Sequence, residues 1–188
     1  DSVPLGSYWV KEIEGPVKGY AIDPGVYPVK VTADATARVN GTAVTDAAKL
    51  NPLDIFLHKK DAQSGTAHPQ GGATLGDAHF RINYYDVEGA TAEAVAGRTP
   101  KASWVVRTND EGIFSLKQGE GTFMHEDAAG VQTELPYKVE GPAFYHLQDG
   151  TPAMPLGTYT IQEVKAPEGY RLDGTVHVRH ISDDGGAT

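Results

Sequence analysis

The sequence predicts an all-β protein built as an antiparallel β-sandwich, and three observations lead to this fold class. Short runs in which apolar and polar residues alternate, as in half-buried strands, occur along the whole chain. Glycine and proline, 22 and 12 of the 188 residues, separate these runs as turn residues do. No long run shows the period of an amphipathic helix.

Composition narrows the range of functions. A formal net charge of -9 argues against nucleic acid or an anionic membrane as a partner. No apolar run is long enough to cross a bilayer, and we expect any signal peptide or anchor to lie outside these residues. The chain has no cysteine, so disulfides cannot stabilise it as they stabilise many small secreted proteins. Either the protein is intracellular, where disulfides are rare, or a different covalent bond replaces them.

One segment occurs twice in the chain. Residues 4–23 and 155–173 share a Pro-Leu-Gly start, a tyrosine, a glutamate, a proline and a Gly-Tyr pair at matching positions. Glu12 and Glu163 correspond to each other in this alignment. The chain therefore carries parts of two related modules.

The second copy places its glutamate on an apolar face. Residues 156–165 alternate as a strand, and Tyr159, Ile161 and Glu163 share one side of it. A carboxylate that points into a core is costly unless another group pairs with it. We therefore expect a partner for Glu163 inside the sandwich.

Residues 1–51 are predicted to be the C-terminal half of a preceding module. A strand at 26–31 follows the glutamate strand, and Asn40-Gly41 is the strongest hairpin signal in the chain, leading to a strand that ends at Asp46. Half a sandwich has exposed edges and little core, so we expect the native protein to continue N-terminally. Asn51-Pro52 marks the boundary.

Residues 52–188 are predicted to be a second module that lacks its last strand and carries an insertion at 117–152. It begins with a strand at 53–61, in which Ile55, Leu57 and Lys59 share one face. Lys59 thus continues an apolar stripe, as Glu163 does. Further strands are expected at 78–86, where Phe80, Ile82 and Tyr84 face inward, and at 102–108, 113–116, 156–165 and 176–181, with a turn at 109–112.

A lysine and a glutamate that both face a dry core can compensate each other. Burial favours the neutral amine and the neutral carboxylic acid, and a neutral amine is a nucleophile. It can attack the side-chain carbonyl of an adjacent Asp or Asn while the acid polarises that carbonyl and moves protons. The product is an amide between side chains, and water or ammonia is released.

The motifs resemble the Cna B-type (SpaA-type, prealbumin-like) modules of Gram-positive surface adhesins and pilins. The residues that carry the resemblance are Ile55-x-Leu57-x-Lys59-x-Asp61, Gly76-x-Ala78-x-Phe80, the turn from Thr108 to Gly112, Leu156-Gly157-x-Tyr159-x-x-x-Glu163-x-x-Ala166-Pro167-x-Gly169-Tyr170, and Val44-Thr45-Asp46. The resemblance implies a prealbumin-like sandwich whose first-strand lysine is bonded to an Asn or Asp of its last strand, beside an internal acid.

Transferred onto this sequence, the resemblance makes Lys59 the amine and Glu163 the proton shuttle of the second module. In the first module, Glu12 is the shuttle and Asp46 the acceptor. The chain departs from the pattern, because residues 1–188 hold no lysine for the first module and no acceptor for Lys59. Asp46 also stands where many relatives have Asn, which implies water as the leaving group. A further hypothesis is that the Asp46 strand completes the second module of a neighbouring molecule by a strand swap.

Ordinary roles remain open for the same residues. Lys59 can lie at a rim with a buried stem and a solvated ammonium, and Lys60 is the adjacent candidate on the opposite face. Glu12 and Glu163 can be surface partners of Lys11 and Lys165.

Other chemistry has little support in the sequence. The seven histidines lack a metal-ligand spacing, so no metal or cofactor is expected. No phosphate-binding loop or nucleophile elbow occurs, and nothing indicates a hydrolase of transthyretin-like fold. Phe123, Tyr137 and Tyr145 in the insertion form either a satellite core or a ligand-contacting loop.

These expectations combine into one function. The chain is interpreted as a structural stalk module of a cell-wall surface adhesin or pilin, stabilised by a self-formed Lys-Asp or Lys-Asn isopeptide bond and not an enzyme beyond that single turnover. We expect it to be extracellular, anchored to the wall by a segment outside these residues, with neighbouring modules as its partners. The alternative is an adhesin module that contacts host matrix protein or glycan through residues 117–152.

Overall fold

The computed structural model describes residues 4–13, 20–23, 25–31, 47–48, 50–51, 55–60, 65 and 74–182. The chain divides into two compact units, Asp1–Lys49 and Leu50–Thr188. The division comes before Asn51, the predicted end of the first module, because β5 (Leu50–Asn51) pairs with β13 (Met154–Pro155) of the second unit. The expected hairpin at Asn40-Gly41 and the strand ending at Asp46 lie outside the described residues.

The described residues of the first unit form two pairs of antiparallel strands. In the first pair, β1 (Gly6–Lys11) lies against β3 (Val26–Val31) with Gly6 opposite Val31. In the second, β2 (Tyr20–Ala21) lies against β4 (Ala47–Ala48). The β1–β3 register has a counterpart in the second unit, where Gly157 lies opposite Ile181. The sequence repeat is therefore also a repeat of strand pairing.

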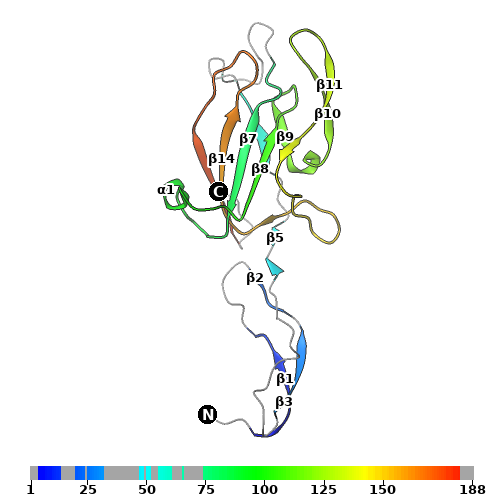
Figure 1. Cartoon of the computed structure of the whole chain (residues 1–188), viewed down its shortest axis with the longest axis vertical. Coiled ribbons are helices and arrows are strands. Elements are labelled where there is room, and N and C mark those ends of the chain that lie inside the picture. Colours follow the sequence, from blue (N-terminus) through cyan, green and yellow to red (C-terminus); the bar gives the residue numbers. More distant parts are fainter. Residues whose placement is uncertain are drawn as a thin grey trace. The chain divides into compact units, whose positions relative to one another are not determined.

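The second unit is organised around a five-stranded antiparallel sheet in the order β12-β8-β7-β14-β15 (Figure 1). Its strands are β7 (His79–Tyr85), β8 (Ala102–Arg107), β12 (Lys138–Glu140), β14 (Gly157–Lys165) and β15 (Val176–Ile181). A separate pair, β6 (Phe56–His58) with β9 (Ile113–Ser115), lies across the core from it. Another pair, β10 (Thr122–Glu126) with β11 (Gln132–Pro136), forms a hairpin within the insertion.

The core lies between the five-stranded sheet and the β6–β9 pair. Alternate residues of β7, β8 and β14 supply it from one side, and β6 and β9 supply it from the other. Its central side chains are Ile82, Tyr84, Trp104, Val106, Phe114, Tyr159 and Ile161, with Ile55, Leu57 and Phe80 packed against them. These contacts make the second unit a two-layered sandwich.

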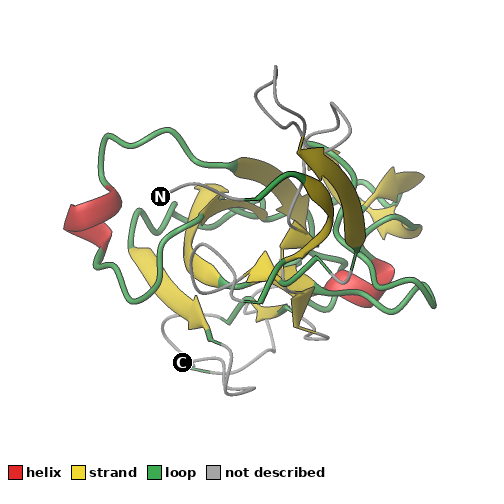
Figure 2. Ribbon diagram, turned by 90° about the horizontal axis from the view of Figure 1, so that it is seen from below, coloured by secondary structure: helices red, strands yellow, loops and turns green. Residues whose placement is uncertain are grey.

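The described strands confirm the alternation that the sequence predicted. Residues 55–60 alternate between partly buried and exposed, with Ile55, Leu57 and Lys59 on the inward face. Ile82 and Tyr84 are buried, and Phe80 packs against the core. The structure adds two helical turns that the sequence analysis missed, α1 (Ala92–Val95) and the 3₁₀ turn Leu116–Gln118 (Figure 2). Both are shorter than two helical turns, so no apolar period could reveal them.

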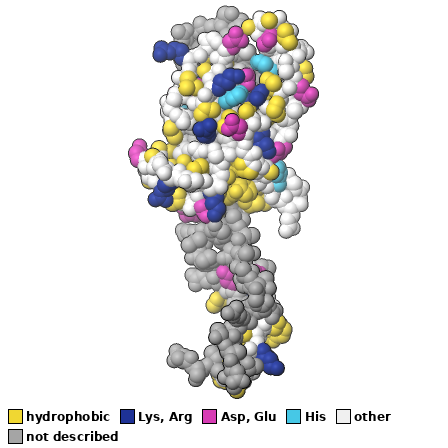
Figure 3. All heavy atoms as spheres, in the orientation of Figure 1, with side chains coloured by type: hydrophobic (Ala, Val, Ile, Leu, Met, Phe, Trp, Pro, Cys, Tyr) yellow, Lys and Arg dark blue, Asp and Glu magenta, His cyan; other side chains and the backbone are white. Residues whose placement is uncertain are grey.

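The surface carries charges of both signs. Figure 3 shows acidic and basic side chains interspersed over the visible face of the second unit. No helix within the described residues combines the length and apolar character needed to cross a bilayer.

Asp77 joins three strands at one end of the five-stranded sheet. Its carboxylate contacts the ring of His79 on β7 at 2.8 Å, Arg107 on β8 at 3.5 Å and the ammonium of Lys165 on β14. Burial by itself raises the pKa of Asp77, but hydrogen bonds from His79 and Lys165 outweigh burial and hold the pKa well below its ordinary 3.8. The carboxylate is therefore ionised throughout the neutral range.

Replacing Asp77 with Asn is expected to lower the free energy of unfolding at pH 6 by about 1–2 kcal/mol, after allowance for solvent screening. A lowered carboxyl pKa contributes stability above its unfolded value of 3.8, and that contribution disappears as the pH falls further towards the folded value. The difference between wild type and Asp77→Asn should therefore shrink below pH 3.8 in urea unfolding curves. A constant difference down to pH 2 would contradict this assignment.

Candidate functional site

The structure brings Lys59 and Glu163 together inside the second unit. The Lys59 Nζ lies 2.7 Å from Glu163 Oε1, and the two side chains are 13% and 2% exposed. Lys59 directly follows β6 and Glu163 belongs to β14, so the pair joins the two layers of the sandwich. Within the described residues Oε1 accepts no hydrogen bond of good geometry. The positive charge of Lys59 is therefore what compensates the buried negative charge of this oxygen.

A turn holds the backbone of Lys59. The Lys59 N–H donates to the carbonyl of Gly112 at 2.8 Å. The Gly112 N–H in turn donates to the carbonyl of Asn109 at 2.8 Å, and this hydrogen bond closes the 109–112 turn. Gly112 has a φ of +77°, which a side chain would oppose. The predicted turn at 109–112 therefore fixes the strand end from which Lys59 reaches inward.

Two neighbouring strands and a backbone donor hold Glu163. β14 lies between β7 and β15, and Glu163 is opposite Phe80. Its second oxygen, Oε2, accepts a hydrogen bond from the Asp173 N–H at 2.7 Å. Hydrogen bonds from Thr175 lower the pKa of the Asp173 carboxyl, and the charge of Lys59 lowers it further. The carboxylate of Glu163 is thus oriented so that Oε1 faces the lysine.

The first unit repeats half of this geometry. Glu12 Oε2 accepts a hydrogen bond from the Asp23 N–H at 2.6 Å, the counterpart of the bond from Asp173. The Tyr8 hydroxyl donates to the Pro4 carbonyl at 2.7 Å, and in the second unit Tyr159 donates to Pro155 at 2.7 Å. No cation of the described residues lies within ion-pair distance of Glu12. Asp46, the predicted acceptor, lies outside the described residues.

A groove with mainly apolar walls opens next to the pair, lined by His58, which precedes Lys59, and by Phe80, which is opposite Glu163. Its volume is about 400 Å³, and its walls include Ile55 and Leu57 near one layer and Phe80, Tyr159 and Ile161 on the other. In the described part of the chain β6 pairs only with β9, and β15 pairs only with β14. Among the described strands, none pairs with the second edge of β6 or of β15, and an extended segment could add at such an edge.

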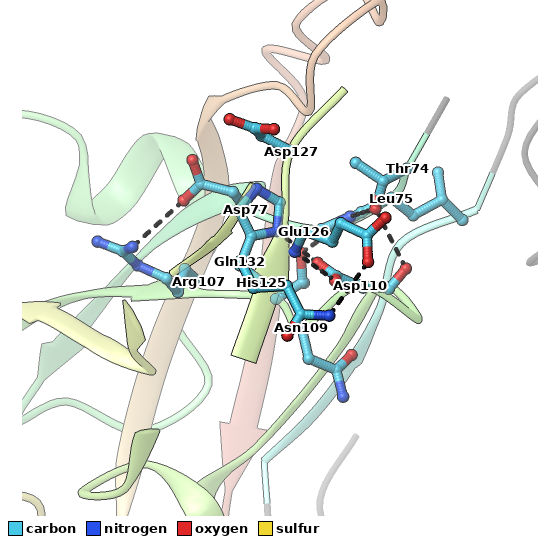
Figure 4. Close-up of polar contacts among 12 residues, drawn as sticks. Thr74, Leu75, Asp77, Arg107, Asn109, Asp110, His125, Glu126, Asp127 and Gln132 are labelled. Carbon is cyan, nitrogen blue, oxygen red and sulfur yellow. Dashed lines mark hydrogen bonds and ion pairs between the residues drawn. The ribbon is translucent and has the colours of Figure 1, made fainter. Parts of the chain in front are cut away.

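The insertion hairpin is anchored to the turn that supports Lys59. One oxygen of Asp110 contacts the His125 Nδ1, and the other accepts a hydrogen bond from the Glu126 N–H at 3.0 Å (Figure 4). The Asp110 carbonyl also accepts a longer contact from the Thr74 hydroxyl at 3.4 Å. Asp110 therefore connects β10 to the 109–112 turn.

Replacing Asp110 with Ala is expected to speed amide hydrogen exchange at Glu126 by at least about tenfold, because the β10 backbone loses its acceptor on the turn. Exchange followed by mass spectrometry or NMR tests this. Glu111→Ala, at an exposed position of the same turn, is the matched control and should leave the Glu126 amide unchanged. Equal protection in the two variants would contradict the anchoring role.

The aromatic residues of the insertion pack into the main core. Tyr137 is 5% exposed, lies 4.8 Å from the Phe123 ring and contacts Phe114, and Tyr145 packs against Tyr84 and Trp104. Tyr137 is therefore closed to a ligand, and the expected satellite core is part of the main one. Phe123 and Tyr145 are partly buried against the same cluster.

The alternative partners considered for the site residues lie elsewhere. Lys60 is exposed on the opposite face, and Lys165 pairs with Asp77 rather than Glu163. Among the described residues no three His, Asp or Glu side chains converge as a metal site would require. Two contributors to the site, Asp173 and Asp110, were not predicted from the sequence. Asp173 had a signal, since its repeat partner Asp23 occupies the same place after the first glutamate.

Residues 148–188 match the family model of the SpaA domain, described as a prealbumin-like fold domain. This match covers β14, Glu163 and β15, and it confirms the prealbumin-like, all-β fold and the resemblance noted in the sequence.

Among solved structures, the Bacillus anthracis TIE protein aligns with 96% of this chain at 19% identity, with a TM-score of 0.45. This chain spans 23% of the length of that chain. No curated protein matches the sequence.

Proposed function

We propose that the chain is a stalk module of a cell-wall surface adhesin or pilin, and that its second unit is stabilised by an isopeptide bond formed by Lys59. The observation that carries the proposal is the buried contact between Lys59 Nζ and Glu163 Oε1 at 2.7 Å. The module holds neighbouring modules of the same chain in a load-bearing line outside the cell.

The proposed bond forms in one turnover from the protein's own side chains. The Lys59 amine, after it gives a proton to Glu163, attacks the side-chain carbonyl carbon of an Asp or Asn. The attacking nitrogen loses a second proton as the amide forms, and Glu163 passes the protons that it takes from the nitrogen to the departing oxygen or nitrogen, which leaves as water or ammonia. A Lys59–Asp/Asn amide remains and Glu163 is regenerated, so no cofactor or oxidant is required.

The groove beside Lys59 supports the entry of an acceptor strand. An extended segment with apolar side chains at alternate positions can fill it and add to the free edge of β6. Asp46 is the acceptor proposed for the first unit with Glu12 as its shuttle. The same strand from a second copy could present Asp46 to Lys59, in which case the chain forms a covalent dimer.

The bond accounts for stability without cysteine. By analogy with a disulfide that closes a loop of this size, it contributes about 4–5 kcal/mol by restricting the unfolded chain. A bond between the first and last strands also carries tension past the interior of the module. This property suits a stalk.

Peptide mapping of the mature protein, isolated from the surface of its own cells, tests the proposal. We expect a branched peptide in which Lys59 is joined to an Asp or Asn, lighter by one water or one ammonia than its two parts. Replacing Glu163 with Ala should leave two separate peptides. For the purified chain alone, intact mass distinguishes a monomer from a dimer that has lost water.

An unmodified Lys59 peptide from the mature protein would exclude the bond. A branched peptide that persists in Glu163→Ala would exclude the role of Glu163 while leaving the bond itself in place.

A further inference from the structure

The opposite face of the five-stranded sheet carries a second cleft. It measures about 510 Å³ and is lined by residues of α1, β7, β14 and β15. Figure 1 shows α1 beside the sheet that carries β7 and β14. Pockets of this size hold small ligands, typically in about 300–1,000 Å³. The cleft has no residue in common with the Lys59 groove, because side chains of successive strand residues point to opposite faces.

A polar row crosses the sheet into this cleft. Asn83 Oδ1 accepts a hydrogen bond from Ser103 at 2.7 Å, and Asn83 Nδ2 donates to Thr160 Oγ1 at 3.4 Å. The register places Asn83 opposite both residues, so the row is set by strand pairing. Among the described residues no partner takes the Thr160 hydroxyl proton, although Thr160 is only 6% exposed. A buried donor on the cleft floor is therefore available to a ligand.

The rim adds acceptors and an aromatic wall. Gln162 donates through Nε2 to the Gly174 carbonyl at 3.0 Å, which leaves its Oε1 as an acceptor. The Glu93 backbone N–H and the Thr91 hydroxyl lower the pKa of the Glu93 carboxyl, so this rim group is an anion at neutral pH. Tyr85 lines one side.

The walls are fixed before any ligand binds. The Thr158 hydroxyl donates to the Val87 carbonyl at 2.6 Å and accepts from the Ala90 N–H at 3.1 Å, which ties the loop before α1 to β14. Thr91 caps α1, and Val95, 1% exposed, packs that helix onto the sheet. A preformed cleft loses little conformational freedom on binding.

We infer that this cleft binds a neutral saccharide of one or two rings. The lining contains no Lys, Arg or His and carries one carboxylate, which argues against a phosphate or another anion. Amides, a hydroxyl and a carboxylate provide paired donors and acceptors for sugar hydroxyls, and Tyr85 offers an apolar face. The site differs from the 117–152 insertion and does not depend on the isopeptide bond.

NMR titration of the ¹⁵N-labelled chain with the methyl glycosides of glucose, galactose, mannose, N-acetylglucosamine and N-acetylgalactosamine tests the inference. At least one sugar should shift the side-chain amide signals of Asn83 and Gln162 and the backbone signals of residues 92–96. Thr160→Val removes the buried hydroxyl and should weaken that binding at least about tenfold. Glu93→Gln, at an exposed position, should also weaken it with no change in folding.

Thr133→Val, which removes an exposed hydroxyl on β11, is the matched control and should bind as wild type does. The inference is overturned if none of the five sugars shifts these signals, or if Thr160→Val and Glu93→Gln both bind as tightly as wild type. It is also overturned if an extended peptide shifts the same signals and the sugars do not. A negative result in these titrations does not bear on the proposed Lys59 bond, because that bond is detected separately by mass spectrometry.

Discussion

Replacing Lys59 with methionine is expected to lower the free energy of unfolding of the second unit by about 3–5 kcal/mol at neutral pH. The variant keeps most of the apolar stem but leaves the Glu163 carboxylate, 2% exposed, without its counter-charge. The Asp173 N–H satisfies only Oε2. Urea unfolding followed by the fluorescence of buried Trp104 measures the change, on chains whose mass shows Lys59 to be uncrosslinked.

Lys60→Met is the matched control, because Lys60 is the exposed neighbour on the opposite face. Its free energy of unfolding should stay within about 0.5 kcal/mol of wild type. The double replacement of Lys59 and Glu163 by methionine should recover much of the loss, since no unpaired charge is then buried. A Lys59→Met chain as stable as Lys60→Met would show that the pair contributes nothing to folding.

Replacing Gly157 with alanine is expected to destabilise the second unit by about 2–4 kcal/mol, through backbone strain and a steric clash together. Gly157 has a φ of +145°, and a Cβ there would lie 2.5 Å from the Tyr85 carbonyl oxygen and 2.9 Å from the Tyr84 ring. Relief would require β14 to move away from β7, and with it Glu163. Thermal unfolding monitored by near-ultraviolet circular dichroism measures the loss.

Gly150→Ala separates the two causes. Gly150 also has a positive φ, +83°, but no atom lies within 4 Å of a Cβ built there. Only strain remains, so its cost should be about 1 kcal/mol. If both variants lose equal stability, the close approach of Gly157 to β7 has no energetic weight.

The alternation of apolar and polar residues was sufficient to predict which side chains face inward wherever a strand has one buried face. The alternation of residues 55–60 and 156–165 alone predicted that Lys59 and Glu163 lie on inward faces, because successive side chains of a strand point to opposite faces. The repeat of residues 4–23 predicted that Glu12 and Glu163 share one environment. Both now accept a backbone N–H from the aspartate that follows in the repeat, at 2.6 and 2.7 Å.

The insertion shows where local pattern was insufficient. Its aromatic residues predicted a satellite core, with a ligand-contacting loop as the alternative, and pattern alone could not decide, since exposure depends on which segment folds over them. The structure buries Tyr137 and anchors the hairpin through Asp110 and His125. Neither contact leaves a periodic signal, because each depends on how separate segments of the chain pack together.

By itself the sequence determined the antiparallel β architecture, the repeated glutamate and the faces on which the two ionisable residues lie. Only the tertiary structure decided that Lys59 and Glu163 lie 2.7 Å apart, that Asp173 orients the carboxylate, and that an apolar groove opens beside them. The physical reason is that strand period is a property of neighbouring residues. Distance, burial and compensation of charge depend on how separate strands pack together.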